Sequence, residues 1–319
     1  GWQVWPAPVK LEPPFVAFPG YNPDTSQFPD DGRSPSFLTS ALTALGLFVE
    51  RPAEPPRPDP EPEPGQSKIQ RIQETLQALD ASALPNAPVE IKVGDHVFSA
   101  TSDDRGYLEV KLPAQMAPPQ QPVEIHLKKP GYDAPPLHST LPVYDGKPGL
   151  AVVSDVDDTV LDSQITDKSK MIKNALTRST WELLTFPDAP QVLSALSKDK
   201  PVFYLSGSPW GFHSRIASFF ARVGLPTGTL ILKRFSSEPL LDQMGFKYPH
   251  LLDIAAALPE KKLLLFGDSG EKDPEIYARL RSEQPQRVAA IYIHLVTPEP
   301  PDSPRFTGMT VFKSWSELP

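Results

Sequence analysis

The sequence predicts an α/β protein in which a parallel-sheet domain is preceded by a small β-sandwich. Three observations support this fold class. The length of 319 residues exceeds one average domain. Apolar residues alternate with polar ones along residues 86–148, and continuous apolar runs alternate with helix-like stretches after residue 149. Alternation is typical of strands with one exposed face, whereas continuous apolar runs are typical of parallel strands buried on both faces.

Proline marks the boundary of the N-terminal part. The chain holds 41 prolines among 319 residues, well above the roughly 5% of average usage. The densest run, residues 51–65, interleaves prolines with acidic side chains. Such a run buries little surface, so residues 1–66 are predicted to be a Pro-rich segment and linker.

Residues 67–148 are expected to form a helix followed by the small β-sandwich. Apolar residues recur at helical spacing over 67–79, from Ile69 to Leu79. The period then changes to two, with turn-forming residues at 94–95 and 103–106 between the predicted strands. The alternating apolar sets are Val89, Ile91 and Val93, then Leu108, Val110 and Leu112, then Val123, Ile125 and Leu127.

Residues 149–319 are predicted to form the parallel-sheet domain. The apolar runs lie at 150–155, 202–207, 229–233, 263–268 and 288–294. Helix-like stretches at 189–198, 212–223 and 274–281 separate several of them. Alternation of buried strands and helices indicates a parallel sheet with helices packed on its faces.

Composition excludes several classes of function. The absence of cysteine excludes disulfides, thiolate zinc sites and cysteine nucleophiles. A net charge of −8 argues against sequence-independent binding of nucleic acid. The longest apolar stretch, 37–49, falls short of the roughly 20 residues of a membrane span, so we expect core packing there and at most peripheral membrane contact. A start at Gly1 favours export after signal-peptide removal, the alternative being a cytoplasmic location.

Polar clusters follow three of the predicted strands. They are SDVDDT at 154–159, SGSPW at 206–210 and GDSGEKD at 267–273. Ligands bind beyond the carboxyl ends of parallel strands, so these clusters are expected to meet. Carboxylates at one edge repel one another unless a hard cation neutralises them, and Mg²⁺ prefers oxygen ligands. The sequence therefore predicts a site for Mg²⁺ and an anion.

Two other interpretations fit these motifs less well. A calcium loop starting at Asp155 would need glycine at its sixth position, where the chain has Val160. A serine hydrolase would use Ser269 of GDSG, but Glu271 stands where the G-x-S-x-G elbow needs its second glycine. The bases open to that chemistry are His213, His250 and His294.

The same motifs resemble those of a known superfamily. DVDDT, the strand-end Ser206, a later lysine and GDSGEKD are similar to the four motifs of the haloacid-dehalogenase superfamily, which implies a haloacid-dehalogenase-like, Rossmann-type domain. Over residues 149–296, SDVDDTV, FYLSGSPW, FARVGLPTG, FGDSGEKDPEIY and AAIYIH resemble the catalytic domain of the phosphatidate phosphatases named for the actin-patch protein. The resemblance implies Mg²⁺-dependent hydrolysis of phosphatidate to diacylglycerol. That family usually has arginine where His294 stands.

Chemistry predicts a role for each polar residue. Asp155 is placed to attack phosphorus and form an aspartyl-phosphate, and Asp157 to protonate the leaving alkoxide and then activate water. Lys247 is preferred over Lys233 as the cation that offsets phosphoryl charge. The predicted metal ligands are Asp155, Asp268, Asp273 and the carbonyl of Asp157.

Other residues are assigned to the phosphate or to the loops around it. The predicted phosphate-side residues are Thr159, Ser206, Gly207 and Trp210, with Thr159 expected chiefly to hold its loop. Trp210 and Phe212 either pack as the first turn of a helix or touch an apolar part of the substrate. Asp158 and Glu275 are interpreted as structural.

Counts of the residues between motifs favour an open site. Only 46 residues separate Thr159 from Ser206, and 40 separate Ser206 from Lys247, which leaves little chain for a lid. This favours a phosphate carried on a large body such as a lipid. The alternatives are a phosphatase of soluble phosphomonoesters or phosphoproteins, and a β-sandwich binding or adhesion module with an inactive phosphatase-like scaffold.

Overall fold

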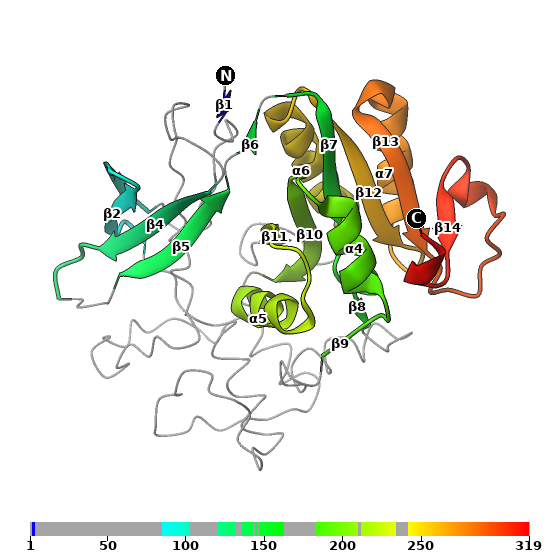
Figure 1. Ribbon diagram of the computed structural model, residues 1–319, viewed down its shortest axis with the longest axis horizontal. Coiled ribbons are helices and arrows are strands. Elements are labelled where there is room, and N and C mark those ends of the chain that lie inside the picture. The colour runs from blue at the N-terminus through cyan, green and yellow to red at the C-terminus, as the bar shows by residue number, and fades with distance from the viewer. Residues whose placement is uncertain are drawn as a thin grey trace, which may run out of the picture.

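The computed structural model describes residues 2–3, 85–102, 120–131, 136–142, 144–145, 147–162, 183–209, 212–233 and 242–318. These residues form a six-stranded parallel sheet with helices and a four-stranded antiparallel sheet (Figure 1). The apolar stretch 37–49, the predicted helix 67–79 and the predicted strand around Val110 lie outside the described residues. The division into domains at residues 66 and 148 stays a prediction.

The parallel sheet has the strand order β11-β10-β7-β12-β13-β14. All neighbouring strands in it run parallel. The chain starts at β7 in the middle, proceeds to one edge, and returns to β12 on the other side, so β7 and β12 flank the topological switch point where such sheets bind ligands. The strands are β7 (Gly149–Ser154), β10 (Val202–Pro209), β11 (Thr229–Lys233), β12 (Lys261–Asp268), β13 (Val288–His294) and β14 (Thr310–Phe312).

Both faces of the parallel sheet are buried. Val152 of β7 belongs to one apolar core and its neighbour Val153 to the other. Helices α4 (Ala189–Ser197) and α5 (His213–Val223) pack on the first face, and α6 (Gln243–Ala257) and α7 (Asp273–Glu283) on the second (Figure 1). This burial explains the continuous apolar runs, and the five predicted strands and three predicted helices of this part are confirmed.

Helix α6 is the long element that the sequence analysis did not predict. Pro249 lies inside it, and an interior proline usually breaks a helix because it lacks an N–H donor. The helix starts at a cap in which Asp242 accepts a hydrogen bond from the Gly245 amide at 2.7 Å. A Cβ on Gly245 would lie 2.1 Å from Asp242 Oδ2, so this cap requires glycine. The helix places Lys247 at the edge of the sheet.

Short elements surround this edge. β8 (Leu161–Asp162) pairs antiparallel with β9 (Leu184–Thr185), and the segment after β13 carries the short helices η5 (Pro304–Phe306) and η6 (Trp315–Glu317). The short helix η4 (Pro285–Arg287) instead precedes β13, at the opposite edge of the sheet. Trp315 is fully buried, and its Nε1 donates to the carbonyl oxygen of Thr159 at 3.1 Å. The end of the chain thus supports the loop that follows β7.

The antiparallel sheet has the order β3-β2-β4-β5 and consists of β2 (Pro88–Val93), β3 (His96–Thr101), β4 (Gln120–Leu127) and β5 (Leu137–Pro142). Val89, Ile91 and Val93 are buried as their alternation predicts, and the Gly94-Asp95 turn joins β2 to β3. Between residues 85 and 142, the described residues form this one four-stranded sheet, so the sandwich stays a prediction. β1 (Trp2–Gln3) pairs with β6 (Tyr144–Asp145).

None of the helices in the described ranges has the length and apolar character of a membrane-spanning segment.

Candidate active site

The three strand-end clusters meet at one edge of the parallel sheet. Tyr204 of β10 and Phe266 of β12 both lie opposite Ser154 of β7, so the residues after them leave the sheet at the same level. The amide of Asp155 donates to the carbonyl oxygen of Phe266 at 2.8 Å, which holds the start of its loop against β12. The expected gathering of polar clusters at the switch point is therefore present.

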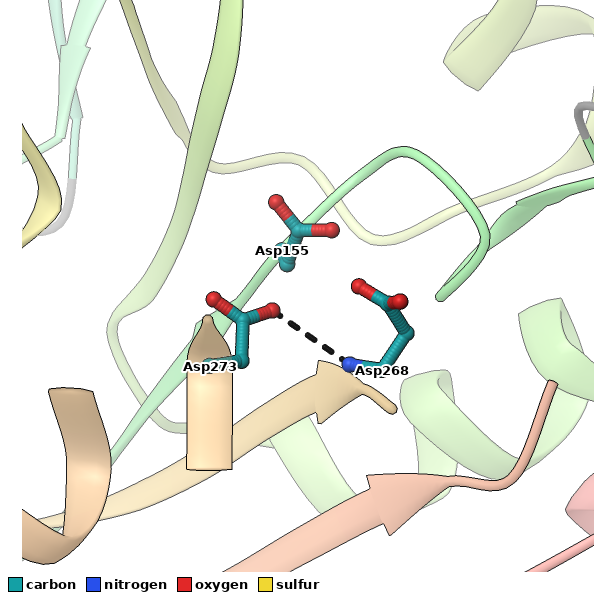
Figure 2. Close-up of side chains that lie close together, drawn as sticks. All are labelled: Asp155, Asp268 and Asp273. Atoms are coloured by element: carbon teal, nitrogen blue, oxygen red, sulfur yellow. Dashed lines mark hydrogen bonds between the residues drawn. The ribbon is translucent and has the colours of Figure 1, made fainter. Parts of the chain in front are cut away.

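Three buried aspartates form the centre of the site. Asp155 follows β7, Asp268 ends β12, and Asp273 begins α7. None of the three is exposed to solvent, and one carboxylate oxygen from each lies within 4.8 Å of the others. Figure 2 shows the three carboxyl groups gathered around one space. This is a cluster of hard oxygen donors.

Lys247 is the cation that contacts this cluster. Its Nζ lies 2.8 Å from Asp155 Oδ1, 2.6 Å from Asp273 Oδ1 and 3.2 Å from Glu271 Oε2. The Nζ of Lys233 instead donates to the main-chain carbonyl of the residue that caps α6, at 3.0 Å. The structure thus brings Lys247, and not its rival, against the acids.

Negative charge exceeds positive charge in this buried site. Burial raises the pKa of Asp155 well above its usual value, with Asp273 adding to the shift and Lys247 opposing it. Burial and the neighbouring Asp273 likewise raise the pKa of Asp268. Burial alone would lower the pKa of Lys247, but the surrounding carboxylates outweigh it and raise that pKa. A further cation would relieve the excess negative charge.

Asp268 is oriented by its own loop. Its Oδ1 accepts hydrogen bonds from the amides of Gly270 at 2.6 Å and Glu271 at 3.0 Å. Its Oδ2 is buried and has no hydrogen-bond partner among the described residues. Such an oxygen is costly to bury unless a donor or a cation satisfies it.

Gly267 allows the close approach of Asp273. The Asp273 Oδ2 accepts a hydrogen bond from the amide of Asp268 at 3.3 Å. A Cβ at position 267 would lie 2.5 Å from the Asp273 Cβ, so a larger residue would displace this carboxylate. The first glycine of the GDSGEKD motif is therefore needed for close packing against Asp273.

Asp157 lies beside the cluster and is held by two serines of the β10 end. Its Oδ2 accepts hydrogen bonds from Ser206 Oγ at 2.9 Å and from Ser208 Oγ at 3.0 Å. The amide of Ser208 donates to Ser206 Oγ at 3.0 Å. Burial and Glu271 raise the pKa of Asp157, while the two hydroxyl groups lower it. Its side chain is not among the three clustered carboxyl groups, and its main-chain carbonyl stays the predicted ligand.

The remaining residues expected near the phosphate have different surroundings. Thr159 Oγ1 donates to Asp155 Oδ2 at 3.3 Å, which suits its expected role in holding the loop. Among the described residues, no atom lies within 4 Å of the place that a Cβ on Gly207 would take. Trp210 lies outside the described residues, and its contact with substrate stays a prediction. Phe212 packs against the apolar core, as the packing alternative expects.

Ser269 has a structural environment rather than that of a nucleophile. Its Oγ accepts hydrogen bonds from the amides of Val296 at 2.9 Å and Thr297 at 3.1 Å. The same oxygen lies 2.9 Å from Thr297 Oγ1. These contacts join the loop after β12 to the loop after β13, and they argue against the serine-hydrolase interpretation.

His294 is buried at the end of β13 between aromatic rings. Its Nδ1 lies 2.8 Å from the carbonyl oxygen of Asp158, and its Nε2 lies 3.3 Å from that of Lys313. The ring stacks on Phe312 and meets Phe186 edge to face. Its contacts are those of a satisfied strand-end histidine.

Several residues that were not expected from the sequence also lie at the site. Glu271 contacts Lys247 from inside the GDSGEKD motif, and Ser208 contacts Asp157 from inside SGSPW. Their positions inside these two motifs are the feature of the sequence that could have identified them. Arg305 pairs with Glu275 and contacts the GDSGEKD loop from a distant part of the chain, where no local pattern marks it.

Comparison with known proteins finds similarity over the segment that holds the site. Residues 150–295 match the family described as the catalytic domain of phosphatidate phosphatase APP1. Phosphatidate phosphatase APP1 of Saccharomyces cerevisiae is 27% identical over 249 residues, which cover 73% of this chain and 42% of that protein. An uncharacterized protein of Schizosaccharomyces pombe is 26% identical over 163 residues, 49% of this chain and 26% of that protein. The chain thus spans less than half the length of these curated relatives.

Among solved structures, a carbohydrate acetylesterase from Xanthomonas citri aligns with a TM-score of 0.26 and 12% identity, over 66% of this chain and 54% of that one. That likeness has no bearing on the site. The family match, in contrast, includes each strand-end motif from Asp155 to Asp273. Over residues 150–295, this chain is therefore similar to the catalytic domain of phosphatidate phosphatase APP1.

Proposed function

We propose that this protein is a Mg²⁺-dependent phosphatidate phosphatase that hydrolyses phosphatidate to diacylglycerol and phosphate. The observation that carries the proposal is the buried cluster of Asp155, Asp268 and Asp273 with Lys247 at the switch point, within the segment similar to the APP1 catalytic domain. The proposal includes a haloacid-dehalogenase-like fold for residues 149–319. Buried, mutually repelling acids at one edge also argue against an inert scaffold.

The residues present fit a magnesium ion. The donors are carboxylate oxygens, which Mg²⁺ prefers over nitrogen or sulfur ligands. The buried Asp268 Oδ2, which has no partner among the described residues, supplies one of them. Asp155, Asp268 and Asp273 would hold the ion together with the carbonyl of Asp157. When bound, it would offset the negative charge of the phosphoryl oxygens.

Asp155 acts as the nucleophile in the proposed reaction. Its carboxylate attacks phosphorus, the phosphorus–oxygen bond to diacylglycerol breaks, and an aspartyl-phosphate forms. Thr159 Oγ1 at 3.3 Å and Lys247 Nζ at 2.8 Å hold its two oxygens in place before the attack. Water then displaces Asp155 from phosphorus and free phosphate is released.

Asp157 transfers the protons. It gives one to the alkoxide of the leaving diacylglycerol and later takes one from the attacking water. Burial and Glu271 favour its protonated form, whereas the hydroxyls of Ser206 and Ser208 favour its ionised form. This balance suits a group that must both give and accept a proton. Ser206 and the amide of Gly207 are proposed to turn to phosphoryl oxygens when substrate binds.

Removal of the cation tests the metal assignment. Excess EDTA is expected to abolish phosphatase activity, and Mg²⁺ is expected to restore it, because the site offers oxygen ligands only. Zn²⁺ alone should not restore it. The control is the same EDTA saturated with Mg²⁺ in advance, measured as phosphate release from an aryl phosphate. Full activity in excess EDTA would contradict the assignment.

The choice of substrate tests the lipid assignment. We expect kcat/KM on phosphatidate in mixed micelles to exceed that on glycerol phosphate by about tenfold or more, since each buried CH₂ contributes about 0.8 kcal/mol. Release of phosphate from both compounds, and from a phosphopeptide, would be compared at saturating Mg²⁺. A preference for glycerol phosphate or for the phosphopeptide would favour the alternative of a soluble substrate and leave the phosphatase chemistry standing.

A further inference from the structure

Arg305 reaches the acidic loop from outside the segment that matches the family. It lies in η5, ten residues beyond the family match at residue 295. Its guanidinium contacts Ser269 and Glu271, which lie between the proposed ligands Asp268 and Asp273, and Glu275, which lies two residues after Asp273. Every N–H of the guanidinium has an acceptor. The contacts are Nε to Glu275 Oε1 at 2.6 Å, Nη2 to Glu275 Oε2 at 3.1 Å, Nη1 to the Ser269 carbonyl at 2.6 Å, Nη1 to Glu299 Oε2 at 3.1 Å, and Nη2 to the Glu271 carbonyl.

One peptide group connects Arg305 to Asp268. The carbonyl of Ser269 accepts from Arg305 Nη1, and the amide of Gly270 in the same peptide group donates to Asp268 Oδ1 at 2.6 Å. A trans peptide is planar, and its C=O and N–H point in opposite directions. Holding the carbonyl on one side therefore fixes the direction of the amide on the other.

This arrangement decides which oxygen of Asp268 the loop amides engage and which one stays available. The amides of Gly270 and Glu271 occupy Oδ1, and the buried Oδ2 is left without a partner among the described residues. Glu275 lies in the first turn of α7, the helix that begins at Asp273, so its pairing with Arg305 also ties that helix to the loop. Two of the three aspartates thus depend on one guanidinium.

We propose that Arg305 is a positioning residue for the cation site, holding the loop 269–272 so that Asp268 presents Oδ2 to Mg²⁺. The inference rests on the proposed function, because it assumes that the aspartates bind Mg²⁺. Groups that orient metal ligands typically change metal affinity by about 10- to 100-fold when removed. Lysine is a poor substitute, since it has three donors and no planar fork.

The chain offers a matched control in Arg281. Its Nη1 and Nη2 donate to the carbonyls of Gly308 at 2.5 Å and Thr307 at 2.6 Å, so it also ties α7 to the C-terminal segment. None of the hydrogen bonds of Arg281 within the described part of the chain goes to the loop 269–272. Arg281→Gln therefore removes comparable anchoring without touching the loop.

The experiment measures Mg²⁺ binding to the full chain by isothermal titration calorimetry, with melting temperatures recorded in EDTA. Arg305→Gln is expected to weaken Mg²⁺ binding by about 10- to 100-fold, and Arg305→Lys to weaken it by a smaller factor. Arg281→Gln is expected to lower the melting temperature in EDTA while leaving the Mg²⁺ affinity within about twofold of wild type.

The outcomes separate this inference from the proposed function. If wild type binds no Mg²⁺, the proposed metal assignment fails. If wild type binds Mg²⁺ and a folded Arg305→Gln binds it equally well, the inference about Arg305 is wrong. Where Arg305→Gln does not fold, wild-type affinity in Arg305→Lys overturns it. An equal loss of affinity in Arg281→Gln, or failure of both Arg305 variants to fold, also overturns it, because Arg305 would then serve general stability.

Discussion

Replacing Asp155 by Asn is expected to lower kcat by at least about 1,000-fold, since loss of a nucleophile commonly removes several orders of magnitude. An amide cannot attack phosphorus as a carboxylate does. Asn has nearly the same shape, keeps an oxygen for Thr159 Oγ1, and removes one charge from a site with excess negative charge. The fold should therefore survive. Phosphate release at saturating Mg²⁺ and far-UV circular dichroism would measure the two effects.

Asp158→Asn is the matched control for this variant. Asp158 lies in the same loop with a φ of 55°, a left-handed conformation that Asn tolerates as well as Asp. We expect its kcat to stay within about tenfold of wild type, because the sequence and the structure give it no part in the reaction. Asp155→Asn with activity within tenfold of wild type would contradict the nucleophile assignment.

Replacing Asp268 by Asn is expected to weaken Mg²⁺ binding and activity by about 100-fold or more, while stabilising the metal-free protein at neutral pH. The loss follows from replacing a charged ligand oxygen by an amide group. The gain follows because the Asn amide would face the neighbouring carboxylates as a donor, where Asp268 Oδ2 now has no partner among the described residues. The remaining oxygen can still accept from the loop amides.

The raised pKa of Asp268 predicts how the stability of the metal-free protein changes with pH. Burial and Asp273 raise the pKa of Asp268 above its ordinary value of 3.8, so the folded state binds more protons than the unfolded state above that pH. In EDTA, the contribution of Asp268 to the free energy of unfolding is therefore largest at low pH. It is lost as the pH rises through the pKa of Asp268 in the folded state. The stability of Asp268→Asn in EDTA should fall less than that of wild type as the pH rises. Burial lowers the pKa of His213 to about 4, so its contribution to stability changes in the opposite direction and falls as the pH falls from 6.5 to 4. Because wild type and variant both contain His213, this contribution cancels when their stabilities are compared.

Melting temperatures in EDTA between pH 5 and 8 would measure this difference. Asp199→Asn, at an exposed position after α4 with a φ of 59° that Asn tolerates as well as Asp, is the control and should melt like wild type at each pH. An Asp268→Asn protein that is less stable than wild type in EDTA at pH 7.5 would contradict the account of excess negative charge.

The sequence by itself determined the parallel sheet and the edge at which its acids meet. Strands buried on both faces must be apolar throughout, so β7, β10, β11, β12 and β13 were visible as continuous runs. Parallel strands place their carboxyl ends at one edge, so Asp155, Ser206 and Asp268 could be brought together before any coordinates were known. These features are local, or follow from the topology of the fold class.

Only the tertiary structure decided which distant residues complete the site. Packing against the sheet lets α6 continue through Pro249, which local propensity alone predicts to be a break. The sequence already favoured Lys247 over Lys233, but only the packing of this helix shows that Lys247 contacts Asp155 together with Asp273 and Glu271. Arg305 reaches the loop of Asp268 because the segment after β13 returns across the edge of the sheet. Contacts between segments far apart in the chain depend on how helices and loops pack, and no periodicity or motif in the sequence records them.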